Sequence, residues 1–169
     1  MRKPFFFGEH ELTIDSKNRM LIPSQIRKSL DPESDGTSFF VIVRAKVAWF
    51  YPCEYFKKLT DLQVSVNLLP DEPEQMFTHF MLSKAAELEW DNQGRVLLTP
   101  MIMTDTEMGN DRDVMLVGAR DHLELWRRDK WKERSELVSA QSGQIIEWWH
   151  NAQQPAKPEA PKEPVKDKE

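Results

Sequence analysis

The sequence contains a single cysteine, Cys53, so no disulfide can form within the chain. A lone thiol is typical of a reducing compartment, and no His or Asp lies close to it in sequence, which favours an inert side chain. Long apolar runs are also missing. The longest, residues 38–51, is interrupted by Arg44 and Lys46 and cannot span a bilayer, and the apolar start ends at Gly8, too early for a signal peptide. We therefore expect a cytoplasmic protein that does not bind membranes.

Signals of enzymatic chemistry are equally scarce. The six glycines form no phosphate-cradling loop, and no serine lies in a nucleophile elbow. The acidic loop around Asp111 does not fit a calcium-binding template, and the histidines have no metal-ligand spacing. We expect no catalytic activity, no cofactor or metal, and no small-molecule substrate. The scattered histidines are His10, His79, His122 and His150.

The chain lacks the basic excess of a polybasic nucleic-acid binder, since its formal net charge is -5 at pH 7. This total is only weak evidence against DNA binding, because a partner responds to local patches. Residues 1–62 hold ten Lys/Arg and eight Asp/Glu, whereas residues 84–138 hold nine and twelve. Any DNA contact is therefore expected in the first segment, which is the only one with net positive charge.

What the sequence does contain is a five-residue pattern that occurs twice. Asp15-Ser16-Lys17-Asn18-Arg19 and Asp91-Asn92-Gln93-Gly94-Arg95 both read Asp-x-x-(Gly/Asn)-Arg. Each follows an alternating run and precedes a short apolar run that ends at a proline. The period of about 76 residues is too long for a solenoid. It is typical of a small domain that was duplicated once.

The elements around the two patterns are predicted to follow the same order. Alternating apolar residues before each pattern indicate a half-buried strand, and the apolar run after it indicates a return strand. A proline then begins a short helix, followed by two further strands and a second helix. We therefore predict an α+β protein that is mostly β. The predicted strands are 9–14, 19–22, 39–43 and 47–51 in the first copy and 86–90, 96–98, 114–117 and 122–126 in the second.

Three segments lie outside this order. Residues 74–82 have helical spacing, and their large apolar side chains are expected to pack in the core. Residues 139–154 are expected to extend the last helix. Residues 155–169 are rich in Pro, Lys, Glu and Ala, which predicts a disordered tail. The side chains expected in the core are Met76, Phe77, Phe80 and Met81.

Two interpretations of the repeated pattern remain open. In the first it is a structural turn: the aspartate bonds the turn backbone, the fourth residue takes positive φ, and the arginine pairs with the aspartate. In the second, Arg19 and Lys17 contact DNA, because a guanidinium fork fits phosphates and guanine edges and a two-stranded ribbon can enter the major groove. A structural turn has no need of Lys17 or of a basic cluster beside it. The turn residues are Asp15, Asn18, Asp91 and Gly94.

The residues around both patterns resemble a known family. Residues 8–23, GEHELTIDSKNRMLIP, look like the first repeat of the MraZ family, and residues 86–98, AELEWDNQGRVLL, look like the second. Val117-Gly118, followed by Leu125-Trp126 and Trp131, fits the later strands and helix. The resemblance covers about residues 5–138, and the paired patterns at this spacing are fairly specific.

This resemblance implies a bacterial transcriptional regulator, of the kind encoded at the head of the division and cell-wall gene cluster. Each half would be an AbrB-type swapped-hairpin unit, and the two halves would form an intramolecular pseudo-dimer barrel. Family members assemble into rings whose paired patterns face double-stranded DNA. The expected segments are a first repeat (5–62), a connecting segment with a short helix (63–83), a second repeat (84–138), a helical extension (139–154) and the tail (155–169).

The chain departs from the family pattern in ways that move the expected DNA contact toward the first copy. Asn18 is found where glycine is usual, Gln93 replaces the usual lysine, and Arg27 has no basic counterpart in the second copy. A nucleoid-associated ring is expected to bind short direct repeats spaced about 10 bp apart, with multivalency offsetting the few contacts of each subunit. The expected DNA-binding residues are Lys17, Arg19, Lys3, Arg27, Lys28 and Arg95.

A scaffolding role is the alternative from another class. The six Trp and nine Phe exceed what a small monomer needs, so some are expected at contacts between subunits. A ring that serves only as a scaffold would keep the apolar pattern and lose the cations. The loss of a cation at Gln93 favours this alternative, whereas Lys17 and Arg19 favour DNA binding.

Overall fold

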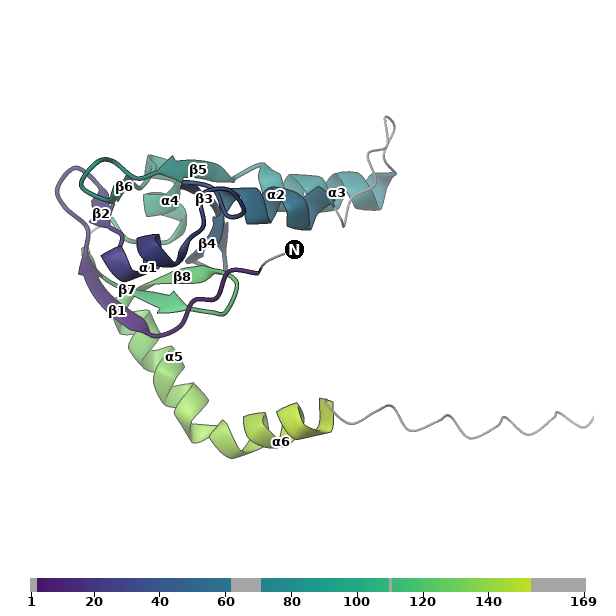
Figure 1. The fold of residues 1–169 in the computed structure, drawn as a ribbon. Helices are drawn as coiled ribbons and strands as arrows, with labels where there is room; N and C mark the ends of the chain where they lie inside the picture. Colours follow the sequence, from purple (N-terminus) through teal and green to yellow (C-terminus); the bar gives the residue numbers. More distant parts are fainter. Residues whose placement is uncertain (1–2, 62–70, 110, 153–169) are drawn as a thin grey trace, which may run out of the picture. The chain divides into compact units, whose positions relative to one another are not determined.

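A computed structural model describes residues 3–61, 71–109 and 111–152 (Figure 1). The predicted tail, 155–169, and residues 63–70 of the connecting segment lie outside these described residues. The chain divides into two compact units, Met1–Lys132 and Glu133–Glu169.

Among the described residues, eight strands build the first unit, and each of them pairs with a strand of the other sequence repeat. Six form one antiparallel sheet in the order β1-β7-β8-β4-β3-β5, and β2 pairs with β6 in a separate two-stranded ribbon. The contacts β1–β7, β8–β4, β3–β5 and β2–β6 all join the two repeats. The strands are β1 (Glu9–Thr13), β2 (Arg19–Leu21), β3 (Ser38–Arg44), β4 (Val47–Pro52), β5 (Ala86–Glu89), β6 (Arg95–Leu97), β7 (Asp113–Gly118) and β8 (Leu123–Arg127).

The prediction of a mostly β, α+β protein is therefore confirmed, but the described strands do not close into a barrel. The six-stranded sheet ends at β1 and β5, and an isolated bridge between Trp90, just after β5, and Val96 of β6 links it to the ribbon. Side chains also join them: Met20 of β2 and Val96 of β6 are fully buried in the same core as Phe39, Phe50 and Leu116 of the sheet. The ribbon is thus held to the sheet by apolar packing.

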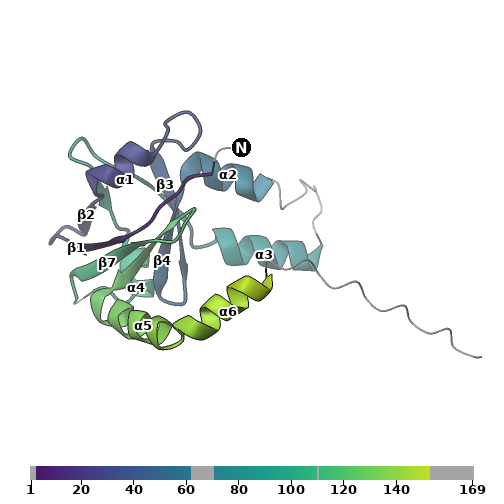
Figure 2. The ribbon, with the colours of Figure 1, turned by 60° about the horizontal axis from the view of Figure 1, so that its bottom comes forward.

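Two short helices pack against this core. They are α1 (Ser24–Ser29) and α4 (Pro100–Asp105), and Ile26 and Ile102 are their buried anchors. In Figure 2 the two helices lie on opposite sides of the strands. The hydroxyl of Thr99 accepts a hydrogen bond from the Ile102 N–H at 3.3 Å and so caps α4.

The predicted core packing of the connecting helix is wrong. Helix α3 (Glu72–Leu82) has no buried residue, and the side chains of Met76 and Phe80 are 65% and 67% exposed. Helix α3 contacts the rest of the unit along one edge, where its Met81 packs against a small cluster around Tyr51 and Phe56. Phe56 belongs to helix α2 (Cys53–Asp61). Helical spacing shows that apolar residues share a face, but burial also requires a partner surface large enough to cover that face.

Two further helices follow β8. Helix α5 (Arg128–Ala140) crosses the boundary between the units, and α6 (Ser142–Ala152) belongs to the second unit. Helix α6 exposes a group of large apolar side chains. Among the described residues, no helix is long and apolar enough to cross a membrane. The exposed side chains of α6 are Ile145, Ile146, Trp148 and Trp149.

Candidate nucleic-acid interface

The first repeated pattern folds into a loop around the carboxylate of Asp15. Oδ1 accepts hydrogen bonds from the backbone N–H groups of Lys17 (2.8 Å) and Arg19 (2.9 Å). Oδ2 accepts from Nε of Arg19 and lies 2.8 Å from its Nη2. The backbone of Asn18 takes a φ of 59°, which turns the chain into β2. Bonds from the backbone and side chain of Arg19 lower the pKa of Asp15 to about 2.

The second pattern repeats this geometry bond for bond. Oδ1 of Asp91 accepts from the backbone N–H groups of Gln93 (2.9 Å) and Arg95 (3.0 Å), and Oδ2 accepts from Nε and Nη2 of Arg95. Gly94 supplies the positive φ, at 80°. Bonds from the side chain and backbone of Arg95 lower the pKa of Asp91 to about 2. The aspartate and arginine of each pattern therefore build its turn together.

The ribbon between the loops carries both arginines on its outer face. Arg19 pairs with Leu97 and Leu21 pairs with Arg95, so all four side chains share the face opposite the buried Met20 and Val96. Leu21 and Leu97 are 50% and 58% exposed. The outer face is therefore a small surface in which each arginine lies across from a leucine. Its width, two strands, fits the DNA major groove.

An arginine that the sequence did not single out supports the first loop. Arg112, just before β7, donates from Nη1 to the backbone oxygen of Asp15 (3.0 Å) and to Oδ1 of Asn18 (2.7 Å). It is 94 residues from Asn18 in sequence, so no local pattern could have found it. The side chain of Asn18 therefore has a structural partner from the other repeat.

Arg27, at the end of α1, lies against the second loop. Its Nε donates to the backbone oxygen of Ile22 at 3.1 Å, and a Cβ added to Gly94 would overlap its Cζ. The guanidinium thus occupies the space that a side chain at position 94 would need. Glycine at position 94 therefore leaves room for this guanidinium. It also places a cation beside the loop that has Gln93 where the first loop has Lys17.

The remaining predicted cations differ in position. Lys17 is exposed in the first loop, and Lys28 is exposed on α1, next to Arg27 in sequence. Lys3 is exposed but not near the loops: Phe6 pairs with Arg120 beyond the start of β1, whereas the first loop follows its end. The structure therefore brings Arg27 to the second loop and keeps Lys17 and Arg19 in the first.

Comparison with known proteins decides the family. The chain is 32% identical to a transcriptional regulator MraZ of Neisseria meningitidis over 135 residues, which cover 80% of this chain and 87% of the relative. The chain belongs to the MraZ family. A family model described as "MraZ protein" matches residues 81–144. Another protein named transcriptional regulator MraZ, from Syntrophobacter fumaroxidans, is 29% identical over 149 residues, 88% of this chain and 96% of the relative.

Membership of the MraZ family confirms the resemblance seen in the sequence and identifies a transcriptional regulator. The match to the regulator of Clostridium tetani, 30% identical over 132 residues, covers 78% of this chain and 87% of the relative. These alignments span nearly the whole length of the MraZ relatives.

Proposed function

We propose that this MraZ-family regulator binds double-stranded DNA in a sequence-specific manner, and that it controls the division and cell-wall gene cluster. The observation that carries the proposal is the β2–β6 ribbon, with an arginine of each repeat on its outer face. The DNA contacts are assigned to Lys17 and Arg19 first, with Lys28, Arg27 and Arg95 adding charge. We assign the protein to the cytoplasm, on the nucleoid.

The Asp–Arg pairs support this role through pre-organisation. A guanidinium has five N–H donors. In the guanidinium of Arg19, the nitrogens that contact Asp15 are Nε and Nη2. The Nη1 group is available in chemical terms for a phosphate or a guanine edge. Because the aspartate already fixes the arginine, less side-chain entropy is lost when DNA binds.

The repeats are proposed to form a swapped-hairpin pseudo-dimer, with residues 5–62 and 84–138 as its halves. The matching bonds of the two loops and the pairing of strands across the repeats support this assignment. The barrel of such a unit would be completed by apolar packing between the sheet and the ribbon. We further propose that identical chains assemble into a ring that binds short direct repeats about 10 bp apart.

A ring compensates for the small number of cations in each chain. The protein is acidic overall, with a net charge of -5, so a single ribbon would bind DNA weakly and with strong salt dependence. Several ribbons on one face raise the apparent affinity without new contacts in any subunit, because each further contact becomes intramolecular.

The test is fluorescence anisotropy on DNA obtained by in-vitro selection, with wild type, Arg19→Ala and Arg44→Ala compared. Arg44 is a matched control, since it is an exposed arginine that lies over Trp49, on β3 and not on the ribbon. Arg19→Ala is expected to lower affinity by at least about tenfold, and Arg44→Ala to leave it within about twofold. Full binding by Arg19→Ala would contradict the assignment.

A scaffold that forms rings but binds DNA weakly or not at all is the second candidate. The exposed apolar faces of α3 and α6 favour it, because such surfaces mark contacts with other chains. Light scattering combined with anisotropy separates the candidates. If light scattering shows a ring but the anisotropy of labelled DNA does not rise when protein is added at low salt, the scaffold is supported. Salt-sensitive DNA binding supports the regulator.

A further inference from the structure

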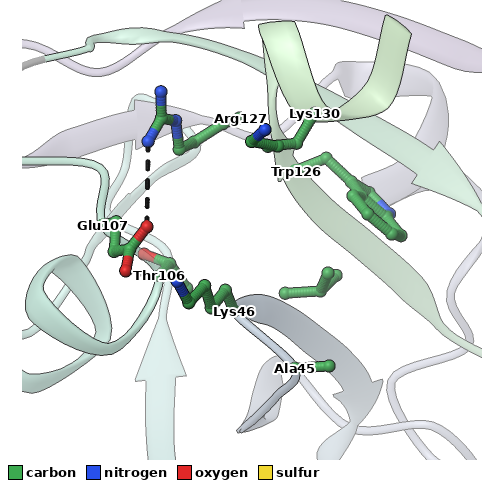
Figure 3. Close-up of a pocket in the computed structure, with 8 residues that line it drawn as sticks. Ala45, Lys46, Thr106, Glu107, Trp126, Arg127 and Lys130 are labelled. Carbon is green, nitrogen blue, oxygen red and sulfur yellow. Dashed lines mark ion pairs between the residues drawn. The ribbon is translucent and has the colours of Figure 1, made fainter. Parts of the chain in front are cut away.

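A pocket of about 130 Å³ lies where the β3–β4 turn meets the end of β8 (Figure 3). It is distinct from the ribbon and its loops, and no step of DNA binding uses it. The end of α4 forms one wall, and the start of α5 forms another. The lining residues are Ala45, Lys46, Val47, Thr106, Glu107, Trp126, Arg127 and Lys130.

One side of the pocket is apolar and fixed in place. Ala45 and Val47 contribute small apolar groups, and Trp126 contributes an aromatic ring. The indole Nε1 of Trp126 donates to Oε2 of Glu124 at 2.8 Å, and its ring lies 5.7 Å from the ring of Trp131. These contacts hold the ring in one orientation, so the pocket has a rigid flat wall suited to a planar ligand.

The other side carries three cations around the carboxylate of Glu107, and one of them, Arg127, also donates from Nε and Nη2 to Asp129 at 3.0 and 2.8 Å, which leaves its Nη1 facing Glu107. Nζ of Lys46 lies 2.6 Å from Oε1 of Glu107, and Nη1 of Arg127 lies 3.9 Å from Oε2. In Figure 3 Glu107 and Arg127 point toward each other. Lys46, Arg127 and the nearby Lys130 all lower the pKa of Glu107. The charges of the pocket lining therefore favour an anion at the position of this carboxylate.

The backbone of the pocket is held in an unfavourable conformation. Ala45, Lys46 and Glu107 have φ values of 49°, 66° and 59°. They are three of the five non-glycine residues with positive φ in the part of the chain that the structure describes. Each costs on the order of 1–2 kcal/mol relative to a residue with negative φ. Ala45 and Lys46 form the two-residue turn between β3 and β4, a turn that requires positive φ at both residues, and Glu107 follows the C-cap of α4, where positive φ is common.

We propose that this pocket binds a small aromatic monocarboxylate, with the ring against Trp126 and the carboxylate bound by Lys46 and Arg127. In the free protein Glu107 occupies the anion position, and the ligand displaces it. The side chain of Glu107 is 49% exposed, so it can move into solvent without repacking the core. The site takes an effector and not a substrate, and it goes beyond the proposed DNA-binding role.

Titration of the full chain with benzoate, followed by amide and indole NMR spectra, tests the proposal in the absence of DNA. The expected result is saturable shifts at Lys46, Val47 and the Trp126 indole N–H, with a dissociation constant on the order of 1 mM. Benzyl alcohol and benzylamine have the same ring without the negative charge and are expected to bind at least about fivefold more weakly. Equal binding of benzylamine, or no saturable shift at these residues, would overturn the proposal.

Two variants give effects of opposite sign. Glu107→Gln removes the internal competitor and is expected to tighten benzoate binding by about two- to fivefold, whereas Lys46→Gln is expected to weaken it by a similar factor. Lys57→Gln is the matched control, because Lys57 makes an exposed pair with Glu54 on α2 at 2.9 Å. Weaker binding by Glu107→Gln would show that the carboxylate does not hold the anion position. Because no DNA is present, failure here leaves the DNA-binding proposal untouched.

Discussion

The loops at Asp15–Arg19 and Asp91–Arg95 share their aspartate-centred bonds and differ in what surrounds them. Arg112 lies against the first loop and Arg27 against the second, and each comes from the other repeat. The shared bonds show that an aspartate, an arginine four residues later and a residue with positive φ between them build the same turn twice. The differences show that the two loops differ in charge, through Lys17 and Gln93, and in the arginine that the opposite repeat places beside each of them.

The largest expected effect comes from making the loops alike in charge. Lys17→Gln gives the first loop the uncharged side chain of the second and is expected to lower DNA affinity by at least about tenfold in a multivalent assembly. Gln93→Lys makes the reverse change and is expected to raise affinity. Anisotropy at several salt concentrations measures both, and the salt slope should fall for Lys17→Gln and rise for Gln93→Lys. An unchanged salt slope in both variants would show that the charge at positions 17 and 93 does not contribute to DNA binding.

Exchanging the fourth residues of the two loops, Asn18 and Gly94, tests how much space each loop has for a side chain at that position. Gly94→Asn places a Cβ against Arg27 and is expected to cost about 1–2 kcal/mol in the free energy of unfolding. Asn18→Gly loses the bond to Arg112 but relieves the positive φ, so it is expected to stay within about 1 kcal/mol. Urea unfolding measures both changes.

The control for this exchange is Gly109→Asn, since a Cβ there meets nothing within 4 Å. If the contact with Arg27 causes the cost at position 94, Arg27→Ala should recover part of it in the double variant. An equal cost with and without Arg27 would assign the loss to backbone conformation alone.

Removal of each supporting arginine should loosen only one loop. Arg112→Ala is expected to speed amide hydrogen exchange at Lys17 and Arg19 by about tenfold and to leave Gln93 and Arg95 unchanged. Arg27→Ala is expected to do the reverse. Exchange measured by NMR gives all four rates in one experiment. Faster exchange in both loops of either variant would mean that the ribbon responds as a unit.

The smallest difference between the loops is expected on acidification. The pKa values of Asp15 and Asp91 are both lowered to about 2, below the ordinary 3.8. Each carboxylate therefore stabilises the folded chain fully above about pH 4, and this stabilisation is lost as the pH falls toward 2. Carboxyl NMR titration should give similar values for both residues. Arg19→Ala should raise the pKa of Asp15 and leave that of Asp91 unchanged.

The sequence predicted the element order and the turns because both depend on short-range patterns. Alternation identified β1 and β5, and the Asp-x-x-x-Arg spacing suggested the turn in which arginine and aspartate pair. It could not predict that β1 pairs with β7, because alternation reports which face is buried and not which strand is adjacent. The role of Arg112 depends on a contact across 94 residues and was hidden for the same reason. The open sheet and the bare face of α3 likewise depend on long-range packing.

The pairing of β2 with β6 places one strand of the ribbon in each half of the chain. A ribosome that has released only the first half has produced Lys17 and Arg19 but not the strand beside them. The ribbon can form only after residues 95–97 have emerged, when most of the chain has been made. In an ordinary two-chain dimer the same pairing would depend on protein concentration. Here it depends on translation reaching the second half, so a product truncated before residue 95 cannot form the ribbon.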